Sequence, residues 1–286
     1  MSRIAYVNGL YTPLRDASVH VEDRGFQFAD GVYEVCEIFG GKIIDETRHL
    51  ARLKRSLAEL SIRMPVKEGA LKVILRETVR RNRVRNGLVY FQVTRGSARR
   101  DFVFPAADTP PTLVVIARPV DRTKVEAGAA AGISVITVPD NRWERVDIKT
   151  TGLLPNSLAR QKAKLQGARE AWFFDEDGYV TEGAASNAWI VTKENTLVTR
   201  PAESGILRGI TRTTLIDLAK RDNFIVSERP FTVAEAKAAR EAFITAATAV
   251  ITPVVKIDDT VLGDGKPGTL AIKLRAHFHS VAEHST

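Results

Sequence analysis

The chain has 286 residues, of which 44% are hydrophobic and 27% charged, proportions that are ordinary for a globular protein. They exclude an intrinsically disordered chain, and no apolar run is long enough to span a membrane. The formal net charge is +8, but the basic residues are scattered among 34 acids, without a zinc-finger spacing or an aromatic nucleic-acid platform. We therefore expect neither a membrane nor a nucleic acid as a partner.

Cysteine usage bears on the compartment. The single cysteine, Cys36, excludes an internal disulfide and lies in the apolar run VYEVCEIF, where a small buried hydrophobe is expected. The opening stretch MSRIAYVNGLYTP lacks the apolar core of a secretory signal. Both observations favour a cytoplasmic protein.

The first half of the chain alternates strands with two helices. Residues 3–7 and 17–22 are predicted strands around a turn, and residues 31–44 are a predicted hairpin that turns at Gly40–Gly41. Leucines at helical spacing predict a helix over 46–62, and a similar pattern predicts one over 66–84. Strands are expected at 87–96 and 112–120, before an irregular Pro, Gly and Ala-rich crossing at about 119–132.

The second half repeats this mixture. Predicted strands occupy 133–139, 170–183, 187–200 and 241–259, and predicted helices lie within 149–168, 211–223 and 232–240 and from Thr269 onwards. Hairpins mixed with crossovers indicate an α+β, or mixed α/β, fold. We expect a smaller domain over 1–118, a linker over 119–125 and a larger domain over 126–286.

Two charged residues stand out by their positions. Lys149 is expected just after a strand in RWERVDIKTTGLLPN, although a lysine at a strand end is most often a solvated surface residue. Glu182, in VTEGAASN, is expected between a strand and a turn of small residues, where its carboxylate can reach a cleft. The glycine-punctuated loop SGILRGITR opens a helix at Ile210–Thr211, whose N–H groups can bind an anion or simply form a capped helix end.

Together these features describe one kind of chemistry. An amine that can form a Schiff base, a carboxylate that can hold a ring nitrogen protonated and a phosphate cradle are what a pyridoxal phosphate enzyme requires. Each feature alone has an ordinary structural explanation. Their combination indicates a cofactor site.

Seven motifs in order along the chain carry a resemblance to a known family. They are EDRGFQFADGVYE at 22–34, HLARL at 49–53, YFQVTRG at 90–96, RWERVDIKTTGLL at 142–154, VTEGAASN at 180–187, ILRGITR at 206–212 and ITPV at 251–254. In these motifs the chain resembles the fold-type IV pyridoxal phosphate transaminases, and among them the D-amino-acid transaminases. The resemblance implies that family's two-domain fold, its pyridoxal 5′-phosphate cofactor and a homodimer.

The resemblance also implies roles for particular residues. Lys149 is similar to the lysine that forms the Schiff base and moves the substrate's α-proton, and Glu182 to the carboxylate on the ring nitrogen. Tyr33 is similar to an active-site tyrosine that binds substrate, although ordinary strand packing would also explain it.

Five further positions resemble cofactor contacts of the family. Arg52 is similar to the phosphate-binding arginine, although the residue pattern alone places it on the polar face of a helix. The other phosphate donors implied are Ile210, Thr211 and Thr248, and the apolar residue behind the ring is Leu207.

Substrate choice in D-amino-acid transaminases depends on a carboxylate trap that includes an Arg-x-His sequence upstream of Phe-Pro. Here the stretch is TRGSARRDFVFP, so that Arg100 takes the arginine position and Phe102 stands where histidine is usual; Arg99 is an additional nearby cation. An arginine can bind a carboxylate in a two-point fork without the histidine. We therefore expect a looser grip on D-amino acids, with 2-oxoglutarate or pyruvate as acceptor, and a side activity on (R)-primary amines.

Other functions stay open at this point. Aminodeoxychorismate lyase shares the scaffold and the DRG opening, and an (R)-amine transaminase would follow if Phe102 opens the pocket further. A branched-chain L-amino-acid transaminase is disfavoured, because the glycine-rich and aromatic signature that we associate with its N-terminal segment is absent. A carrier protein that binds the cofactor without turnover is the alternative from a different class.

Overall fold

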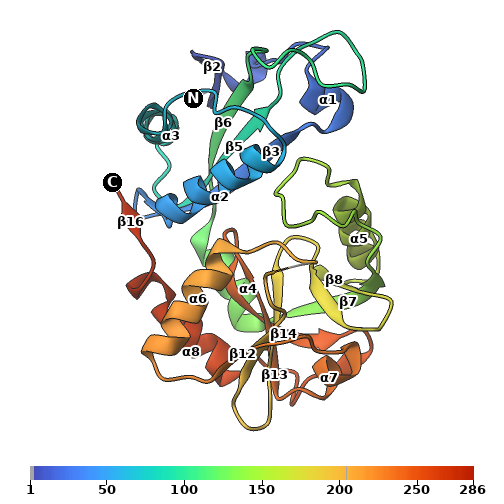
Figure 1. The fold of residues 1–286 in the computed structure, drawn as a ribbon. Helices are drawn as coiled ribbons and strands as arrows, with labels where there is room; N and C mark the ends of the chain where they lie inside the picture. Colours follow the sequence, from blue (N-terminus) through green and yellow to red (C-terminus); the bar gives the residue numbers. More distant parts are fainter. Residues whose placement is uncertain (1–2, 204) are drawn as a thin grey trace. The chain divides into compact units, whose positions relative to one another are not determined.

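The computed structural model describes residues 3–203 and 205–286, and it contains both helices and sheets, as the sequence predicts (Figure 1). Two compact units emerge, and we describe each by itself. The first contains the described residues up to 121 together with 148–152 and 283–286, and the second contains the described residues of 122–147 and 153–282. Compact units are not the same as domains, so the division into 1–118, 119–125 and 126–286 stays a prediction.

The first unit is built on one antiparallel sheet. Its seven strands run in the order β16-β4-β3-β5-β6-β1-β2. Their bounds are β1 (Ile4–Val7), β2 (Leu10–Pro13), β3 (Gly31–Phe39), β4 (Lys42–Ile44), β5 (Gly87–Thr94), β6 (Thr112–Pro119) and β16 (His284–Ser285). The predicted hairpin at Gly40–Gly41 is confirmed by the antiparallel pairing of β3 with β4.

The predicted strand at 17–22 is wrong. The chain already reverses at Asn8–Gly9, where both residues have positive φ angles of 45° and 100°, and it pairs as β2 before a short 3-10 helix, Leu14–Asp16. Asn-Gly is the sequence that two-residue hairpin turns favour, because both residues tolerate positive φ. The second strand therefore begins seven residues earlier than we expected.

Helices cover the sheet of the first unit. They are α1 (Arg24–Phe28), α2 (Glu46–Glu59) and α3 (Glu68–Arg81), and α2 packs on β3 while α3 packs on β6 and β1 (Figure 1). The leucines predicted to face the core on α2, Leu50, Leu53 and Leu57, are buried. The helical spacing read from the sequence is confirmed.

Strand β3 brings an acid into this core. Its residues alternate in burial, and the fully buried set contains Val32, Cys36 and Ile38, together with Glu34. Because strand side chains alternate between the two faces, Tyr33 points to the opposite face. Glu34 is a carboxylate in an otherwise apolar row, and such a group needs partners.

The second unit contains a nine-stranded mixed sheet. The strand order is β12-β11-β10-β13-β14-β7-β8-β9, and β15 pairs with β14 off this path. The bounds are β7 (Ile133–Pro139), β8 (Glu170–Phe174), β9 (Val180–Gly183), β10 (Asn187–Val191), β11 (Leu197–Thr199), β12 (Val226–Glu228), β13 (Glu241–Ala246), β14 (Val250–Ile257) and β15 (Thr260–Val261). Two parallel pairs lie at its centre, β14 with β7 and β7 with β8.

Helices pack against this sheet as well. They are α4 (Arg122–Ala131), α5 (Leu154–Leu165), α6 (Ile210–Arg221), α7 (Val233–Ala238) and α8 (Thr269–His277), with a 3-10 turn at Phe278–Ser280. Helix α5 packs on β8 and β7, and α6 and α8 pack on β13 and on each other. No helix in residues 3–203 and 205–286 combines the length and apolar character needed to cross a bilayer.

Two local predictions in this region are wrong. The expected irregular crossing before β7 is helix α4, because its alanines are strong helix formers and outweigh Gly128. The strand expected just before Lys149 is a series of turns. There the arginines pair within the segment, Arg142 with Asp140 and Arg145 with Asp147, and such short-range bonds compete with strand pairing.

Candidate active site

Lys149 lies on the open edge of strand β3 in the first unit. The Tyr33 N–H donates to the Lys149 carbonyl at 3.0 Å, and the Thr151 N–H donates to the Gly31 carbonyl at 3.0 Å. A β-bridge joins Val32 to Thr150 between these two bonds. The segment 148–152 thus pairs with the first residues of β3, on the side where β4 pairs with the last ones, and this fixes the backbone at the predicted reactive lysine.

The Lys149 amine lies against an aromatic surface. Its Nζ is 4.3 Å from the centroid of the Tyr33 ring, and Tyr33 stacks on Tyr90 with 5.5 Å between the ring centroids. The Tyr90 hydroxyl donates to the Gln92 side chain. Burial, with a contribution from Tyr33, raises the pKa of Tyr90 to about 12, so this phenol stays protonated near neutral pH. The structure therefore brings together the predicted residues Lys149 and Tyr33.

Arg52 is anchored by a carboxylate that we did not predict. Its Nε donates to Glu34 Oε1 at 2.7 Å, its Nη2 donates to Glu34 Oε2 at 2.8 Å, and His49 Nδ1 lies 2.7 Å from Glu34 Oε2. Burial by itself raises the pKa of Glu34, but Arg52 and His49 outweigh it and lower that pKa to about 2. The sequence signal for Glu34 was a charged residue at a position that strand alternation places among apolar residues on one face of β3.

The predicted substrate residues lie on an exposed loop after β5. Phe102 is 84% exposed and packs its ring 5.7 Å from that of Phe28, and the guanidinium of Arg100 lies 4.6 Å from the Phe28 centroid. Arg24 is bonded to this loop, since its Nη1 donates to the Asp101 carbonyl at 2.6 Å. Arg100 and Phe102 are therefore neighbours around Phe28, and the additional cation Arg99 is exposed.

Glu182 is the buried carboxylate of the second unit. It lies inside β9 rather than after it, and only 5% of its surface is exposed. Arg142 Nη1 donates to its Oε1 at 2.6 Å, and Oε2 accepts from Asn187 Nδ2 and from the Leu207 N–H, both at 3.1 Å. These bonds join three of the motifs noted in the sequence and favour the ionised carboxylate.

Arg142 is a further residue that the sequence reasoning missed. Its guanidinium lies between two carboxylates, donating also to Asp140 Oδ2 at 2.6 Å, and it sits 4.4 Å from the centroid of the Phe173 ring. Burial lowers the pKa of Arg142, but Asp140 and Glu182 raise it overall, so the side chain stays charged. The signal was present in RWERVDIK, which we used to locate Lys149 without assigning a role to its first arginine.

The start of α6 packs closely beside Glu182. Asn187 Nδ2 donates to the Leu207 carbonyl at 3.0 Å, and a Cβ on Gly209 would collide with the Asn187 side-chain oxygen. Gly209 is the N-cap of α6 and supplies no side-chain cap, while Ile210 and Thr211 in the first turn are buried. The loop in which the glycines predict an anion site therefore packs closely, through its backbone, against Asn187, a partner of Glu182.

Thr248 lies in the turn between β13 and β14 and is exposed. Three residues before it, Thr245 pairs in register with Asn187 of β10. The strand pairing connects this turn to the end of the motif that contains Glu182, but Thr248 itself carries no geometry that assigns it a ligand.

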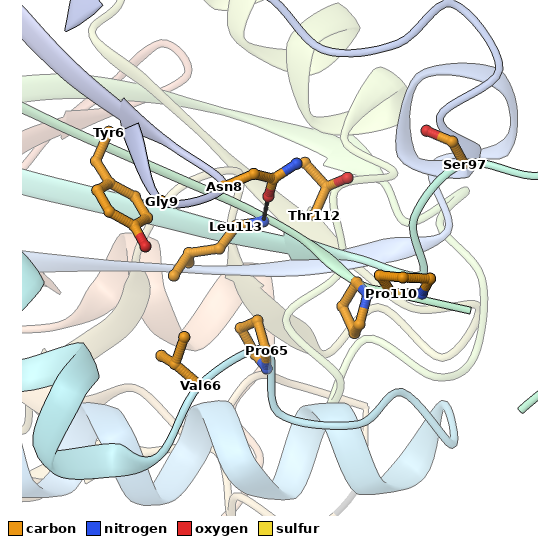
Figure 2. A pocket seen from close by; sticks show the side chains of 10 residues that line it. Tyr6, Asn8, Gly9, Pro65, Val66, Ser97, Pro110, Thr112 and Leu113 are labelled. Atoms are coloured by element: carbon orange, nitrogen blue, oxygen red, sulfur yellow. Dashed lines mark hydrogen bonds between the residues drawn. The ribbon is translucent and has the colours of Figure 1, made fainter. Parts of the chain in front are cut away.

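A cavity of about 490 Å³ in the first unit lies elsewhere (Figure 2). Its lining is uncharged and rich in proline: Tyr6, Asn8, Gly9, Pro65, Val66, Ser97, Pro110, Pro111, Thr112 and Leu113. Figure 2 shows the Asn8 side chain bonded to the Leu113 backbone, a contact of 2.8 Å that closes the turn at one rim. None of the predicted site residues belongs to this lining.

Comparison with protein families decides the class of the chain. Residues 31–257 match the family model described as amino-transferase class IV. The chain belongs to this family. The predicted α+β fold and the family resemblance read from the sequence are both confirmed.

Curated relatives are similar over almost the whole chain. A D-alanine aminotransferase of Bacillus licheniformis is 41% identical over 263 residues, which cover 92% of this chain and 91% of the relative. One of Listeria innocua serovar 6a is 40% identical over 273 residues, covering 95% and 93%. One of Staphylococcus haemolyticus is 36% identical over 278 residues, covering 97% of each chain.

Solved structures of a different aminotransferase share the fold. A branched-chain amino acid aminotransferase from T.th., solved with pyridoxamine 5′-phosphate, superposes with a TM-score of 0.89 at 26% identity, covering 98% of this chain and 94% of that one. A branched-chain aminotransferase from Thermoproteus uzoniensis with norvaline gives 0.85 at 25% identity, covering 99% of each chain. Sequence identity is thus higher to the D-alanine aminotransferases.

Proposed function

We propose that the protein is a pyridoxal 5′-phosphate-dependent D-amino-acid transaminase. It moves the amino group of D-amino acids such as D-alanine to a 2-keto acid, with 2-oxoglutarate or pyruvate as acceptor. The observation that carries the proposal is the greater identity, over almost the full length, to D-alanine aminotransferases than to the branched-chain enzymes of the same fold.

The residues present suit this cofactor. Glu182 is a buried carboxylate whose bonds to Arg142, Asn187 and the Leu207 N–H favour its ionised form, which is the form that would accept a ring N–H. Arg52 is a buried guanidinium with one edge fixed. The first turn of α6, with Ile210 and Thr211, lacks a side-chain cap and is suited to a phosphate.

The chain's own residues then have distinct tasks. When bound, pyridoxal phosphate supplies an electron sink that makes the α-proton of an amino acid labile. Lys149 attaches the cofactor through Nζ and afterwards takes and returns that proton. Glu182 would accept a hydrogen bond from the ring nitrogen, and Leu207 would supply the apolar contact to the ring. Arg52, the first turn of α6 and the Thr248 hydroxyl are the proposed ligands of the phosphate.

Substrate selection falls to Tyr33, Arg100 and Phe102. Arg100 can bind the substrate carboxylate by a two-point fork, and Phe102 replaces a polar donor by an apolar ring. A lost hydrogen bond to a charged group corresponds to about tenfold to a hundredfold in affinity. We therefore include a side activity on (R)-primary amines, which lack the carboxylate.

Assembly and location complete the proposal. We infer a homodimer, in line with the family resemblance, and a cytoplasmic enzyme, in line with a single buried cysteine that forms no disulfide. Sedimentation of the cofactor-loaded protein at micromolar concentration tests the first inference, and a monomer there would contradict it.

The test of the function is transamination from each amino donor to 2-oxoglutarate, followed as glutamate formation. We expect turnover with D-alanine, little with L-leucine, and loss of at least about a thousandfold in Lys149→Ala. Lys162→Ala, an exposed lysine on α5, is the matched control and should stay fully active. Faster turnover of L-leucine than of D-alanine would instead favour the branched-chain activity suggested by the fold neighbours.

A further inference from the structure

A buried ionic cluster in the first unit is not explained by the tasks assigned above. Glu34 on β3 is fully buried, and His49 and Arg52, three residues apart on one face of α2, both meet its carboxylate. Residues at this spacing on a helix are neighbours, so both side chains reach the Glu34 carboxylate from the same face of α2. Removing a carboxylate from water is costly, and a purely apolar row would pack this strand without that cost.

The contact geometry fixes the guanidinium of Arg52. Its Nε and Nη2 donate to different oxygens of Glu34, at 2.7 Å and 2.8 Å, which is the two-point arrangement of a planar fork. Because the guanidinium is planar, the edge that carries Nη1 is thereby directed away from Glu34. His49 Nδ1, 2.7 Å from Oε2, holds the carboxylate from turning about its own axis.

The same two elements also hold the Lys149 backbone. The residue after Lys149 forms its β-bridge with β3, and the Lys149 N–H donates to the hydroxyl of Ser56 at 3.4 Å. Ser56 is buried on α2, one helical turn beyond Arg52. The strand that carries Glu34 and the helix that carries Arg52 therefore define the positions of both the lysine backbone and the arginine.

We propose that Glu34, backed by His49, is a positioning residue that orients Arg52 for the 5′-phosphate of the cofactor. This inference rests on the proposed function, in which Arg52 binds that phosphate. A carboxylate next to a phosphate site would otherwise oppose anion binding, so its gain must come from orientation. Arginine has many rotamers, and a fixed fork reduces the freedom lost when the phosphate binds.

The unit also contains a matched pair that serves as a control. Glu46, which is buried, and Arg76, whose side chain is 33% exposed, form a comparable two-point contact between α2 and α3, with Nη1 and Nη2 each 2.9 Å from a different Glu46 oxygen. Neither residue is assigned to cofactor or substrate. Glu46→Gln thus removes a buried carboxylate from an arginine pair of the same helix without touching Arg52.

The experiment measures equilibrium binding of two probes, pyridoxal 5′-phosphate and pyridoxal, to the apoprotein of each variant. For Glu34→Gln we expect affinity for pyridoxal 5′-phosphate to fall about tenfold to a hundredfold while affinity for pyridoxal stays unchanged. Glu34→Asp should recover part of the loss, and Glu46→Gln should change neither affinity.

Equal losses for both probes in Glu34→Gln would reduce Glu34 to a structural residue and overturn the inference, and so would unchanged affinities. If Glu34→Gln does not fold, His49→Gln is tested instead. We then expect a smaller loss of affinity, for pyridoxal 5′-phosphate alone. Equal losses of affinity for both probes would overturn the inference. Wild-type protein that binds neither probe would overturn the proposed function as well. Wild-type binding with an unaffected Glu34→Gln overturns only this inference.

Discussion

Two buried carboxylates, Glu34 in the first unit and Glu182 in the second, are each paired with an arginine but are held in different ways. Both partners of Glu34 come from one helix, α2, and both are side chains that carry or can carry positive charge. Glu182 takes its partners from three separate segments: the Arg142 side chain, the Asn187 amide and the Leu207 backbone.

The difference indicates what each carboxylate is suited to do. A carboxylate that contacts an arginine and a histidine of one helix is suited to hold those two side chains in place. One that is held by an amide, a backbone N–H and an arginine has its charge maintained and its position defined from several directions. Glu34 is therefore suited to positioning and Glu182 to a direct ligand contact.

The largest effect should come from removing the cation that Glu182 shares. Arg142→Met leaves the buried carboxylate of Glu182 and the partly buried one of Asp140 without their common partner, so we expect a loss of about 3–5 kcal/mol in the free energy of unfolding by urea. Arg145→Met is the control, because its pair with Asp147 is half-exposed and worth about 0–1 kcal/mol. Equal losses in the two variants would mean that the network does not depend on Arg142.

Acid titration tests the other carboxylate. The pKa of Glu34 is lowered from 4.5 to about 2, so its ionised form stabilises the fold above pH 4.5 and this stabilisation is lost as the pH falls towards 2. Across that window the free energy of unfolding of the wild type should fall on the order of 3 kcal/mol further than that of Glu34→Gln. Parallel pH profiles for the two proteins would contradict the assignment.

A smaller effect is expected where the Glu182 network meets α6. In Gly209→Ala the new methyl group displaces the Asn187 amide, which should cost about 1–3 kcal/mol of unfolding free energy and lower the cofactor affinity. Gly128→Ala in α4, with nothing near the added methyl group, should instead stabilise by about 1 kcal/mol. A harmless Gly209→Ala would show that the close packing around Glu182 is not needed.

The smallest effect is expected in substrate selectivity, in which neither Glu34 nor Glu182 is assigned a role. Phe102→His restores a polar donor beside Arg100, so the ratio of kcat/KM for D-alanine over (R)-1-phenylethylamine should rise about tenfold. Phe26→His, at another exposed phenylalanine of the first unit, should leave the ratio unchanged. The proposal that Phe102 weakens binding of the substrate carboxylate would fail if the wild type shows no turnover of the amine and Phe102→His shows no rise in kcat/KM for D-alanine.

Elements defined by local patterns could be predicted from the sequence. The leucines of α2, the strand β3 and the hairpin at Gly40–Gly41 each follow from residues close together in the chain, and all were found. Errors arose where local signals compete. The turn that begins at Asn8–Gly9 was made too long. A strand was expected just before Lys149, whereas turns lie there and the Lys149 carbonyl accepts from the N–H of Tyr33, far away in sequence.

The candidate site shows the same limit. The motifs pointed to Lys149 and Glu182, but they could not indicate that Arg142 and Leu207 bond the same carboxylate, because that requires three segments to fold together. Glu34 was missed for a different reason. A strand pattern assigns faces and not partners, so a charge on the buried face has no visible counter-ion until α2 is in place.

The most direct test of the central claim is a single-turnover experiment with the cofactor-loaded enzyme and no keto acid. D-alanine and L-alanine are added separately, and pyruvate is counted per subunit. The account predicts about one pyruvate per subunit from D-alanine, loss of the visible absorbance of the lysine-bound cofactor, and neither change from L-alanine. Pyruvate from L-alanine at the same rate, or none from D-alanine, would contradict it.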